Sequence, residues 1–211
     1  MSGSYEDVER FVRRFADVIA EQKEYLTELD AAIGDADHGI NMNRGMQAVA
    51  KKLDGVEGDD VGALFKTVGM TLISTVGGAG GPLYGTLFLQ LGTGAAGKSA
   101  ITLEDWSAMV AAAVAGVQAR GKAELQDKTM LDALIPARDA LAVAVEAGEG
   151  FAEALGAAAA AAEEGMKGTI PLVARKGRAS YLGERSAGHQ DPGATSSWFL
   201  MRTAAETLGN G

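Results

Sequence analysis

The chain has 211 residues, no cysteine and a formal net charge of −9, and its length and composition fit one globular domain over residues 1–211. The lack of cysteine excludes thiolate catalysis and cysteine-ligated metal sites, and it agrees with a reducing, cytoplasmic setting. Acidic residues outnumber basic ones by 28 to 19, and no apolar run reaches the length of a membrane span, so we expect neither a nucleic-acid partner nor a membrane partner.

Apolar residues recur at helical spacing along almost the whole chain. The first expected helix carries an apolar stripe from Val8 to Ile19, begins at a capping box of Ser4 with Asp7, and continues towards Asp30. The spacing predicts further helices in the first half of the chain over residues 42–53, 61–76 and 83–91.

The second half of the chain has the same helical spacing. A helix over 106–117 is preceded by Thr102 and Asp105 as a capping box, and Thr129 with Asp132 is expected to open the next helix. The last two predicted helices cover residues 150–167 and 194–207. No run of alternating β-branched residues predicts a strand, so the expected fold class is all-α with about eight helices.

Three glycine-rich breaks interrupt the helical pattern, at residues 33–39, 77–82 and 176–194. In the first, Asp30, Asp35 and Asp37 fall within eight residues, and Gly34 allows the chain to turn back so that the later acids face Asp30. Converging carboxylates without basic partners call for a cation, and hard oxygen ligands suit Mg²⁺ or Ca²⁺. The alternative is that these acids only cap helices and form turns.

The second break, GGAGGP, leads directly into a predicted helix. Free backbone N–H groups before a helix can bind phosphate, although neither a Walker A motif nor a preceding strand is present. A simple helix–helix turn with closely packed glycines is the alternative. Binding of a polyphosphate requires a metal site and a set of backbone N–H donors, and the first two breaks together offer both.

The third break gathers Lys176, Arg178 and Arg185 in an otherwise acidic chain, followed by His189 and Asp191. An arginine in such a loop can stabilise the charge on a phosphoryl group during transfer. Because this loop has little apolar surface, it is expected to be mobile without nucleotide and to become ordered when diphosphate and metal bind. The alternative is a solvated loop with ordinary surface charges.

These segments carry a resemblance to a known family. The stretches YLTELDAAIGDADHGINMNRG, GMTLISTVGGAGGPLYGTLF, RGKAELQDKTMLDAL and ARKGRASYLGERSAGHQDPGATS closely resemble the L subunit of bacterial dihydroxyacetone kinases, most closely the type that uses the phosphoenolpyruvate:phosphotransferase system. The resemblance extends from about Tyr25 to Ser196.

The resemblance implies a barrel of eight antiparallel helices with nucleotide and magnesium at one end. It implies that ADP stays bound with two Mg²⁺ as a coenzyme, that a phosphohistidine protein, the M subunit, rephosphorylates it, and that the phosphoryl group passes to dihydroxyacetone on a separate K subunit. Two alternatives stay open: a kinase subunit that uses exchangeable ATP, for dihydroxyacetone or another small ketose, and a nucleotide-bound module that regulates a partner protein such as a transcription factor.

The resemblance also implies site residues. The expected magnesium ligands are Asp30, Asp35 and Asp37, and Arg178 is the expected catalytic residue near the phosphates. The expected nucleotide contacts, Arg178 included, are His38, Gly39, Ile40, Asn41, Ala79, Gly80, Gly121, Met130, Asp191, Pro192 and Gly193. Two residues depart from the family pattern: Gly80 stands where serine is expected, and Gln126 stands where glycine is expected. The first departure removes a hydroxyl donor but keeps the backbone N–H.

Overall fold

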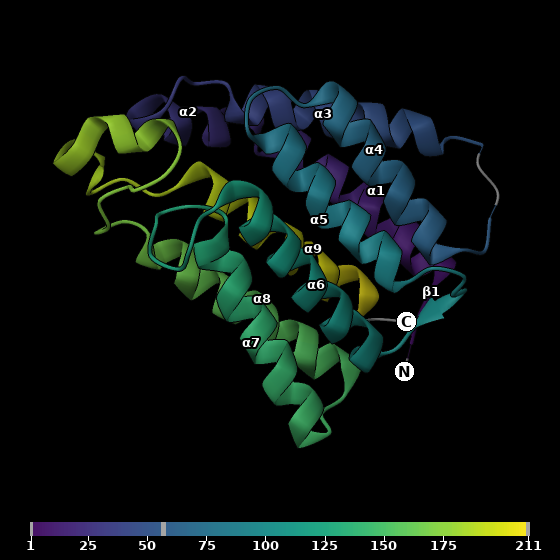
Figure 1. Ribbon diagram of the computed structural model, residues 1–211. Helices are drawn as coiled ribbons and strands as arrows, with labels where there is room; N and C mark the ends of the chain where they lie inside the picture. The colour runs from purple at the N-terminus through teal and green to yellow at the C-terminus, as the bar shows by residue number, and fades with distance from the viewer. Residues whose placement is uncertain (1, 56–57, 210–211) are drawn as a thin grey trace.

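The computed structural model describes residues 2–55 and 58–209, and most of these residues are helical (Figure 1). The α-helices are, in chain order, α1 (Tyr5–Glu21), α2 (Lys23–Ile33), α3 (His38–Leu53), α4 (Val61–Thr75), α5 (Gly80–Gly94), α6 (Leu103–Gly121), α7 (Leu131–Ala147), α8 (Phe151–Gly168) and α9 (Pro192–Leu208). A 3₁₀ helix, η1 (Arg178–Ser186), and two short strands, β1 (Gly3–Ser4) and β2 (Ala100–Ile101), complete the described elements. The predicted all-α class is confirmed.

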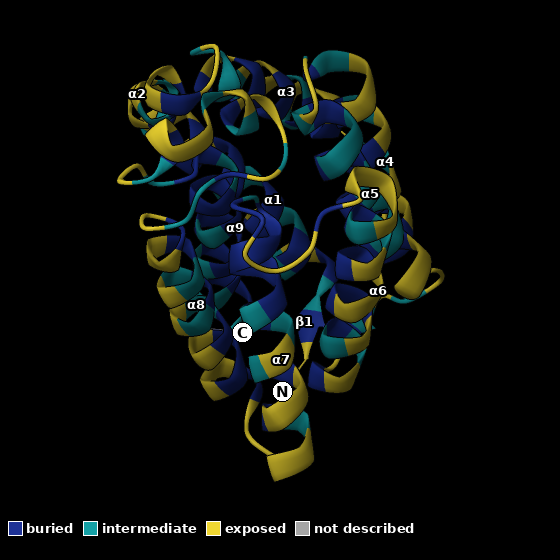
Figure 2. Ribbon diagram, turned by 60° about the vertical axis from the view of Figure 1, so that its left-hand side comes forward, coloured by how far each residue is buried: buried dark blue, intermediate teal, exposed yellow. Residues whose placement is uncertain are grey.

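Eight of the helices form a closed barrel. From α3 to α9 each helix packs against the next one in the chain, and α1 packs against both α3 and α9, so that the ring closes. Helix α2 lies at one end of the ring, against α3, α9 and η1, whereas β1 lies at the opposite end (Figure 1). Figure 2 shows that the buried faces of these helices point into the ring.

An aromatic cluster fills part of the barrel interior. Phe11, Phe65, Phe88 and Trp106 come from α1, α4, α5 and α6, and each is 1% exposed or less. Neighbouring rings in this cluster have centroids 6.0–6.5 Å apart, a spacing at which tilted and edge-on aromatic pairs attract each other. This core supports the helices whose ends form the cavity described below.

Local capping signals were predicted correctly at two helices. Ser4 with Asp7 and Thr102 with Asp105 both form complete capping boxes. The expected start of a helix at Thr129 was wrong, because α7 begins at Leu131. The Asp132 carboxylate instead accepts the backbone N–H of Thr129 at 2.7 Å, so it orders the loop before the helix.

Two other expectations need correction. The stripe that was expected to run as one helix towards Asp30 is divided at Gln22 into α1 and α2, with neither glycine nor proline at the division to announce it. The expected absence of strands was also wrong, because Gly3–Ser4 pairs antiparallel with Ala100–Ile101. Strands of two residues are too short to show an alternating pattern. None of the described helices has the length and apolar character needed to cross a membrane.

Candidate functional site

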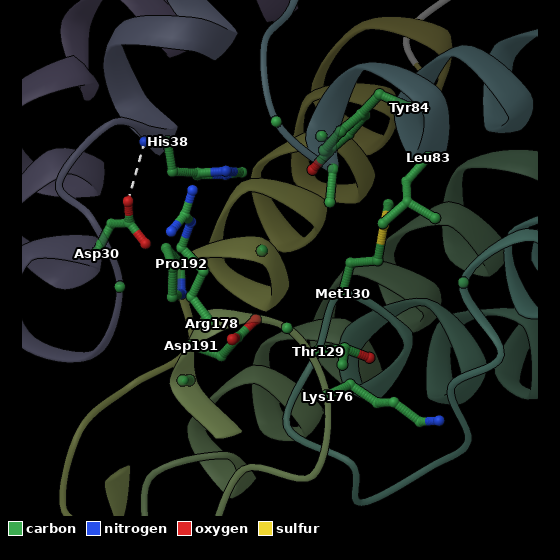
Figure 3. A pocket seen from close by; sticks show the side chains of 18 of the residues that line it. Asp30, His38, Leu83, Tyr84, Thr129, Met130, Lys176, Arg178, Asp191 and Pro192 are labelled. Atoms are coloured by element: carbon green, nitrogen blue, oxygen red, sulfur yellow. Dashed lines mark hydrogen bonds between the residues drawn. The ribbon is translucent and has the colours of Figure 1, made fainter. Parts of the chain in front are cut away.

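A cavity of about 460 Å³ opens at the end of the barrel where α2 and η1 lie (Figure 3). Most of its lining residues come from four regions that are far apart in the sequence: 30–41, 76–84, 117–131 and 176–193. Each region includes a connection that leads into a helix beginning at this end of the barrel. All three glycine-rich breaks therefore contribute to one cavity.

Three carboxylates converge on one wall of the cavity. Asp30 lies in α2, and Asp35 and Asp37 lie in the loop that leads to α3. One oxygen from each carboxylate lies within 4.8 Å of the oxygens contributed by the other two. The buried Asp30 also accepts the backbone N–H groups of Asp37 and His38 on Oδ2, at 2.8 and 3.1 Å. This set of oxygen atoms suits a divalent cation such as Mg²⁺.

Gly34 makes this convergence sterically possible. A Cβ atom at this position would lie 2.1 Å from Oδ1 of Asp30, which is far inside van der Waals contact. The chain therefore folds back over Asp30 only because residue 34 has no side chain. The turn continues through Ala36, whose φ of +59° is in the left-handed region.

Arg178 faces the acidic cluster from η1. Its Nε lies 2.7 Å from Oδ2 of Asp35, and the arginine side chain is 67% exposed. An exposed ion pair of this kind contributes little to the stability of the fold. Its significance is geometric, because it places a guanidinium group, which can donate several hydrogen bonds, at the mouth of the cavity beside the carboxylates.

Four helices begin at the cavity, and their first turns contribute lining residues: His38 in α3, Gly80 in α5, Leu131 in α7 and Pro192 in α9. Helix N-termini carry partial positive charge and unpaired N–H groups, so they attract anions. Ala79, which precedes α5, provides no capping hydrogen bond from its side chain. The cavity thus combines a carboxylate cluster for a cation with helix termini for an anion.

The part of the cavity away from the acids is apolar. Leu83 and Met130 lie side by side in Figure 3, and Val117 and Gly121 from the end of α6 belong to the same lining. A Cβ atom at Gly121 would lie 3.2 Å from Cδ2 of Leu83, so glycine keeps this space open. A flat apolar or aromatic group fits such a wall better than a charged one does.

His38 is held by a buried chain of hydroxyl groups. Its Nε2 lies 2.9 Å from the hydroxyl of Ser196, which lies 2.7 Å from the hydroxyl of Tyr84. Burial lowers the pKa of His38, against the opposing charges of Asp30 and Asp37. Burial likewise raises the pKa of Tyr84 to about 12. Both side chains are therefore neutral hydrogen-bonding groups at pH 7.

Asp191 caps α9 at the edge of the cavity. Its Oδ2 accepts the backbone N–H of Ala194 at 2.7 Å. Burial raises the pKa of Asp191 to about 7, and the charges of Asp132 and Asp30 act in the same direction, whereas the cap hydrogen bond and Lys128 oppose it. In the ligand-free protein this carboxyl group therefore gains its charge near neutral pH.

This raised pKa predicts that the free energy of unfolding falls as the pH rises. Between about pH 4, where an unfolded aspartate ionises, and about pH 7 the native state binds the proton more tightly, so ionisation favours unfolding. Each unit of pKa difference corresponds to about 1.4 kcal/mol, so the effect amounts to a few kcal/mol. Asp191→Asn keeps an oxygen for the cap and cannot ionise. Its free energy of unfolding, compared with that of the wild type at the same pH, should therefore be higher at about pH 8 than at about pH 5.

Urea unfolding of the wild type and the variant at both pH values, without nucleotide or metal, measures this effect. Asp60→Asn is the matched control, because Asp60 caps α4 in the same way but hydrogen bonds to backbone N–H groups, led by that of Ala63, lower the pKa of its carboxyl group. The contribution of the Asp60 carboxyl group to the free energy of unfolding therefore changes only at acidic pH. Equal pH dependence in the wild type and Asp191→Asn would contradict the raised pKa.

Most of the expected site residues line this cavity: Asp30, Asp35, Asp37, His38, Asn41, Ala79, Gly80, Gly121, Met130, Arg178, Asp191, Pro192 and Gly193. Gly39 and Ile40 are not among the lining residues. A Cβ atom at Gly39 would lie 2.1 Å from the carbonyl oxygen of Lys23, so this glycine lets α3 pack closely on α2. Ile40 is 49% exposed. Of the other basic residues in the third break, Lys176 lines the cavity and Arg185 does not.

Sequence reasoning missed several residues of the site. Tyr84 and Ser196 were not singled out, since one apolar helical residue and one serine in a helix carry no distinctive pattern. Lys128 also lines the cavity and is buried, although lysine in a loop is ordinarily a surface residue. The sequence signal that could have indicated Lys128 is the Asp-Lys-Thr stretch within RGKAELQDKTMLDAL, which belongs to the family resemblance.

Comparison with known proteins finds similarity over nearly the whole chain. A family model described as the DAK2 domain matches residues 32–206. The PEP-dependent dihydroxyacetone kinase, ADP-binding subunit DhaL, of Escherichia coli K12 is 47% identical over 205 residues, which cover 97% of this chain and 98% of that protein. The PTS-dependent dihydroxyacetone kinase, ADP-binding subunit DhaL, of Lactococcus lactis is 43% identical and covers 92% of this chain and 93% of its own length.

A solved structure has a similar fold. The crystal structure of the dihydroxyacetone kinase from C. freundii in complex with AMP-PNP and Mg²⁺ aligns with a TM-score of 0.70 and 26% identity over 94% of this chain. The aligned part is 33% of that longer chain. The similarity therefore covers nearly all of this barrel and about a third of the larger kinase.

Proposed function

Since this chain belongs to the DAK2-domain family and to its group of ADP-binding dihydroxyacetone kinase subunits, we propose that it carries the nucleotide in phosphoryl transfer to dihydroxyacetone. It is a kinase subunit that works with partner subunits. The observation that carries the proposal is that three carboxylates and the first turns of four helices meet in one cavity. A magnesium–nucleotide complex needs both parts, one for the metal and one for the phosphates.

The carboxylate oxygens of Asp30, Asp35 and Asp37 would hold the magnesium, and we propose two ions, as the family resemblance implies. Bound Mg²⁺ supplies charge neutralisation for the diphosphate and orients the phosphoryl group that is transferred. The backbone N–H groups at the starts of α3 and α5 would bind phosphate oxygens, which assigns this role to residues 38–41 and to Ala79 and Gly80. For Gly39 and Ile40 the contact would come from the backbone, because their side-chain positions do not line the cavity.

The apolar wall would receive the adenosine. Gly121 leaves space for a flat ring beside Leu83, and Met130 offers a polarisable side chain on the same wall. Residues 191–193 line the cavity at the start of α9, where Gly193 lies next to Met130. Arg178 would donate hydrogen bonds to the phosphoryl group as negative charge develops on it, which makes Arg178 the proposed catalytic residue.

The partners follow from the same proposal. A K subunit would present dihydroxyacetone to the cavity, and the phosphohistidine M subunit would return a phosphoryl group to ADP. The relatives named PEP-dependent and PTS-dependent support this donor. We also propose that residues 1–211 act as one domain in the cytoplasm, with which the lack of cysteine agrees. Binding of a regulatory protein stays a prediction.

Two measurements test the function. Mass analysis of gently purified protein should find ADP, and labelled ATP should exchange with it slowly. Reconstitution with K and M subunits and phosphoenolpyruvate should then produce dihydroxyacetone phosphate, whereas this chain alone should produce none. Fast exchange, with turnover supported by ATP and without M, would identify an ATP-using kinase instead. Turnover by the isolated chain would contradict the proposed division of labour.

Gly80 provides a gain-of-function prediction. A Cβ atom there would meet only Cγ1 of Val76, at 3.4 Å, so the serine that the family pattern leads us to expect fits without strain. Gly80→Ser adds a hydroxyl donor, and a hydrogen bond contributes about 0.5–1.5 kcal/mol, so ADP should bind about 2- to 10-fold more tightly. Calorimetric titration measures the change, and Gly80→Ala is the matched control that lacks the hydroxyl. Equal affinity of both variants would contradict a side-chain contact at residue 80.

A further inference from the structure

Lys128 is a buried lysine whose hydrogen-bonding partners are backbone carbonyl groups. Its side chain is 1% exposed, although lysine is almost never fully buried without a partner. Its Nζ donates to the carbonyl oxygens of Thr169 at 2.7 Å, of Leu172 at 3.1 Å, and of His189, and the carbonyl oxygen of Ile170 lies 3.5 Å away. An ammonium group has three N–H donors, so these carbonyl groups are enough to satisfy it.

The carbonyl groups belong to both ends of one long loop. Residues 169–191, which we call the 169–191 segment, leave α8 and return to the start of α9. The two ends meet, because Gly188 donates its N–H to the carbonyl oxygen of Ile170 at 2.8 Å and Asp191 donates its N–H to Oγ1 of Thr169 at 3.0 Å. Lys128 lies at this neck and binds Thr169 and Leu172 on the outgoing side and His189 on the returning side.

This segment carries groups that face the cavity. Arg178 reaches Asp35 from it, and Asp191 caps α9 where the segment ends. Lys128 itself belongs to the loop between α6 and α7, which contributes Thr129 and Met130 to the cavity wall. One ammonium group therefore joins two walls of the cavity that are separate in the sequence.

We propose that Lys128 is a positioning residue for phosphoryl transfer: its ammonium group fastens the neck of the 169–191 segment and so holds Arg178 in place across the cavity mouth. The part that concerns transfer rests on the proposed function, whereas the fastening of the neck is independent of it. An apolar side chain would leave the neck carbonyl groups without their donor in a buried place, which is unfavourable. The neck would then keep only the hydrogen bonds of Gly188 and Asp191, so it would open more readily and hold Arg178 less firmly.

Lys128→Met tests the proposal, because methionine has a similar length and no donor. Lys122→Met in the same loop is the matched control, since Lys122 is exposed. Without nucleotide, amide hydrogen exchange in the 169–191 segment should become at least about 10-fold faster in Lys128→Met, while α1 and α3–α6 keep their protection. In the reconstituted reaction kcat should fall about 100-fold, with little change in KM for the sugar-loaded partner. The control should resemble the wild type in both measurements.

The lack of cysteine allows a chemical rescue. Lys128→Cys introduces the one thiol of the chain, and in the unfolded protein its thiolate can displace bromide from 2-bromoethylamine. The new C–S bond places an ammonium group at nearly the position of the lysine Nζ. After refolding, this product should regain both the protection of the 169–191 segment and kcat. The same variant alkylated with bromoethane, which adds an uncharged ethyl group, should regain neither.

The outcomes separate this inference from the proposed function. Unchanged exchange in Lys128→Met, or equal rescue by the ethyl and aminoethyl groups, would overturn the role of the ammonium. Faster exchange spread evenly over the barrel would also overturn it, because Lys128 would then support the whole fold rather than the neck. If Lys128→Met does not fold, the comparison of the two alkylated products decides. A wild-type protein that binds no ADP, together with the expected exchange results, would refute the function and leave the fastened neck standing.

Discussion

Asp30→Asn should weaken the binding of Mg²⁺·ADP by about 100-fold or more, because the loss of one buried partner of a charge costs about 3–5 kcal/mol. Asparagine keeps an oxygen that can accept the backbone N–H groups of Asp37 and His38, so the loop should keep its shape. The ligand-free variant should unfold at the same temperature as the wild type or higher, since one of three mutually repelling charges is gone. The rise in melting temperature on adding Mg²⁺·ADP should be lost.

The metal dependence distinguishes a ligand from a general charge effect. Calorimetric titration with ADP in the presence of a chelator should show equal or tighter binding to Asp30→Asn, because less negative charge then faces the diphosphate. In the presence of Mg²⁺ the wild type should bind ADP more tightly than Asp30→Asn does. Asp59→Asn, which changes an exposed acid that does not line the cavity, should match the wild type in every condition. Equal Mg²⁺·ADP affinity in the wild type and Asp30→Asn would refute the metal assignment.

Arg178→Ala should slow phosphoryl transfer by about 100-fold or more, the usual effect of removing a donor that acts mainly in the transition state. Binding of ADP should change much less, because the arginine is 67% exposed and its contact with Asp35 is a surface ion pair. Arg178→Lys keeps the charge but loses the planar arrangement of donors, so it should recover binding and not the rate. Single-turnover transfer and equilibrium titration measure the two quantities separately.

Arg185→Ala is the matched control for Arg178, since Arg185 is an exposed basic residue of η1 that does not line the cavity. It should leave transfer and ADP binding unchanged. A loss confined to ADP affinity in Arg178→Ala would make this arginine a clamp on the bound nucleotide rather than a catalytic group. Unchanged binding and transfer would show that the guanidinium has no role, and the third glycine-rich break would then be a solvated connection.

Local sequence determined the features that depend on neighbours a few residues apart. The helical stripes and the capping boxes at Ser4 and Thr102 follow from the period of the helix and from hydrogen bonds over three residues. The acidic cluster belongs to the same class: Asp30 and Asp37 are seven residues apart, and Gly34 between them allows the turn. These could be read from the sequence because the chain geometry of such a short stretch leaves few alternatives.

Only the tertiary structure showed which hydrogen bonds join groups that are far apart in the sequence. The hydrogen bond of His38 with Ser196 spans 158 residues, that of Tyr84 with Ser196 spans 112, and that of Lys128 with His189 spans 61. Side chains so far apart share no periodic pattern, because their contact depends on how α1 and α9 close the barrel and on how the 169–191 segment returns to its neck. The sequence therefore contained the chemical groups of the cavity, while closure of the ring determined which of them face one another.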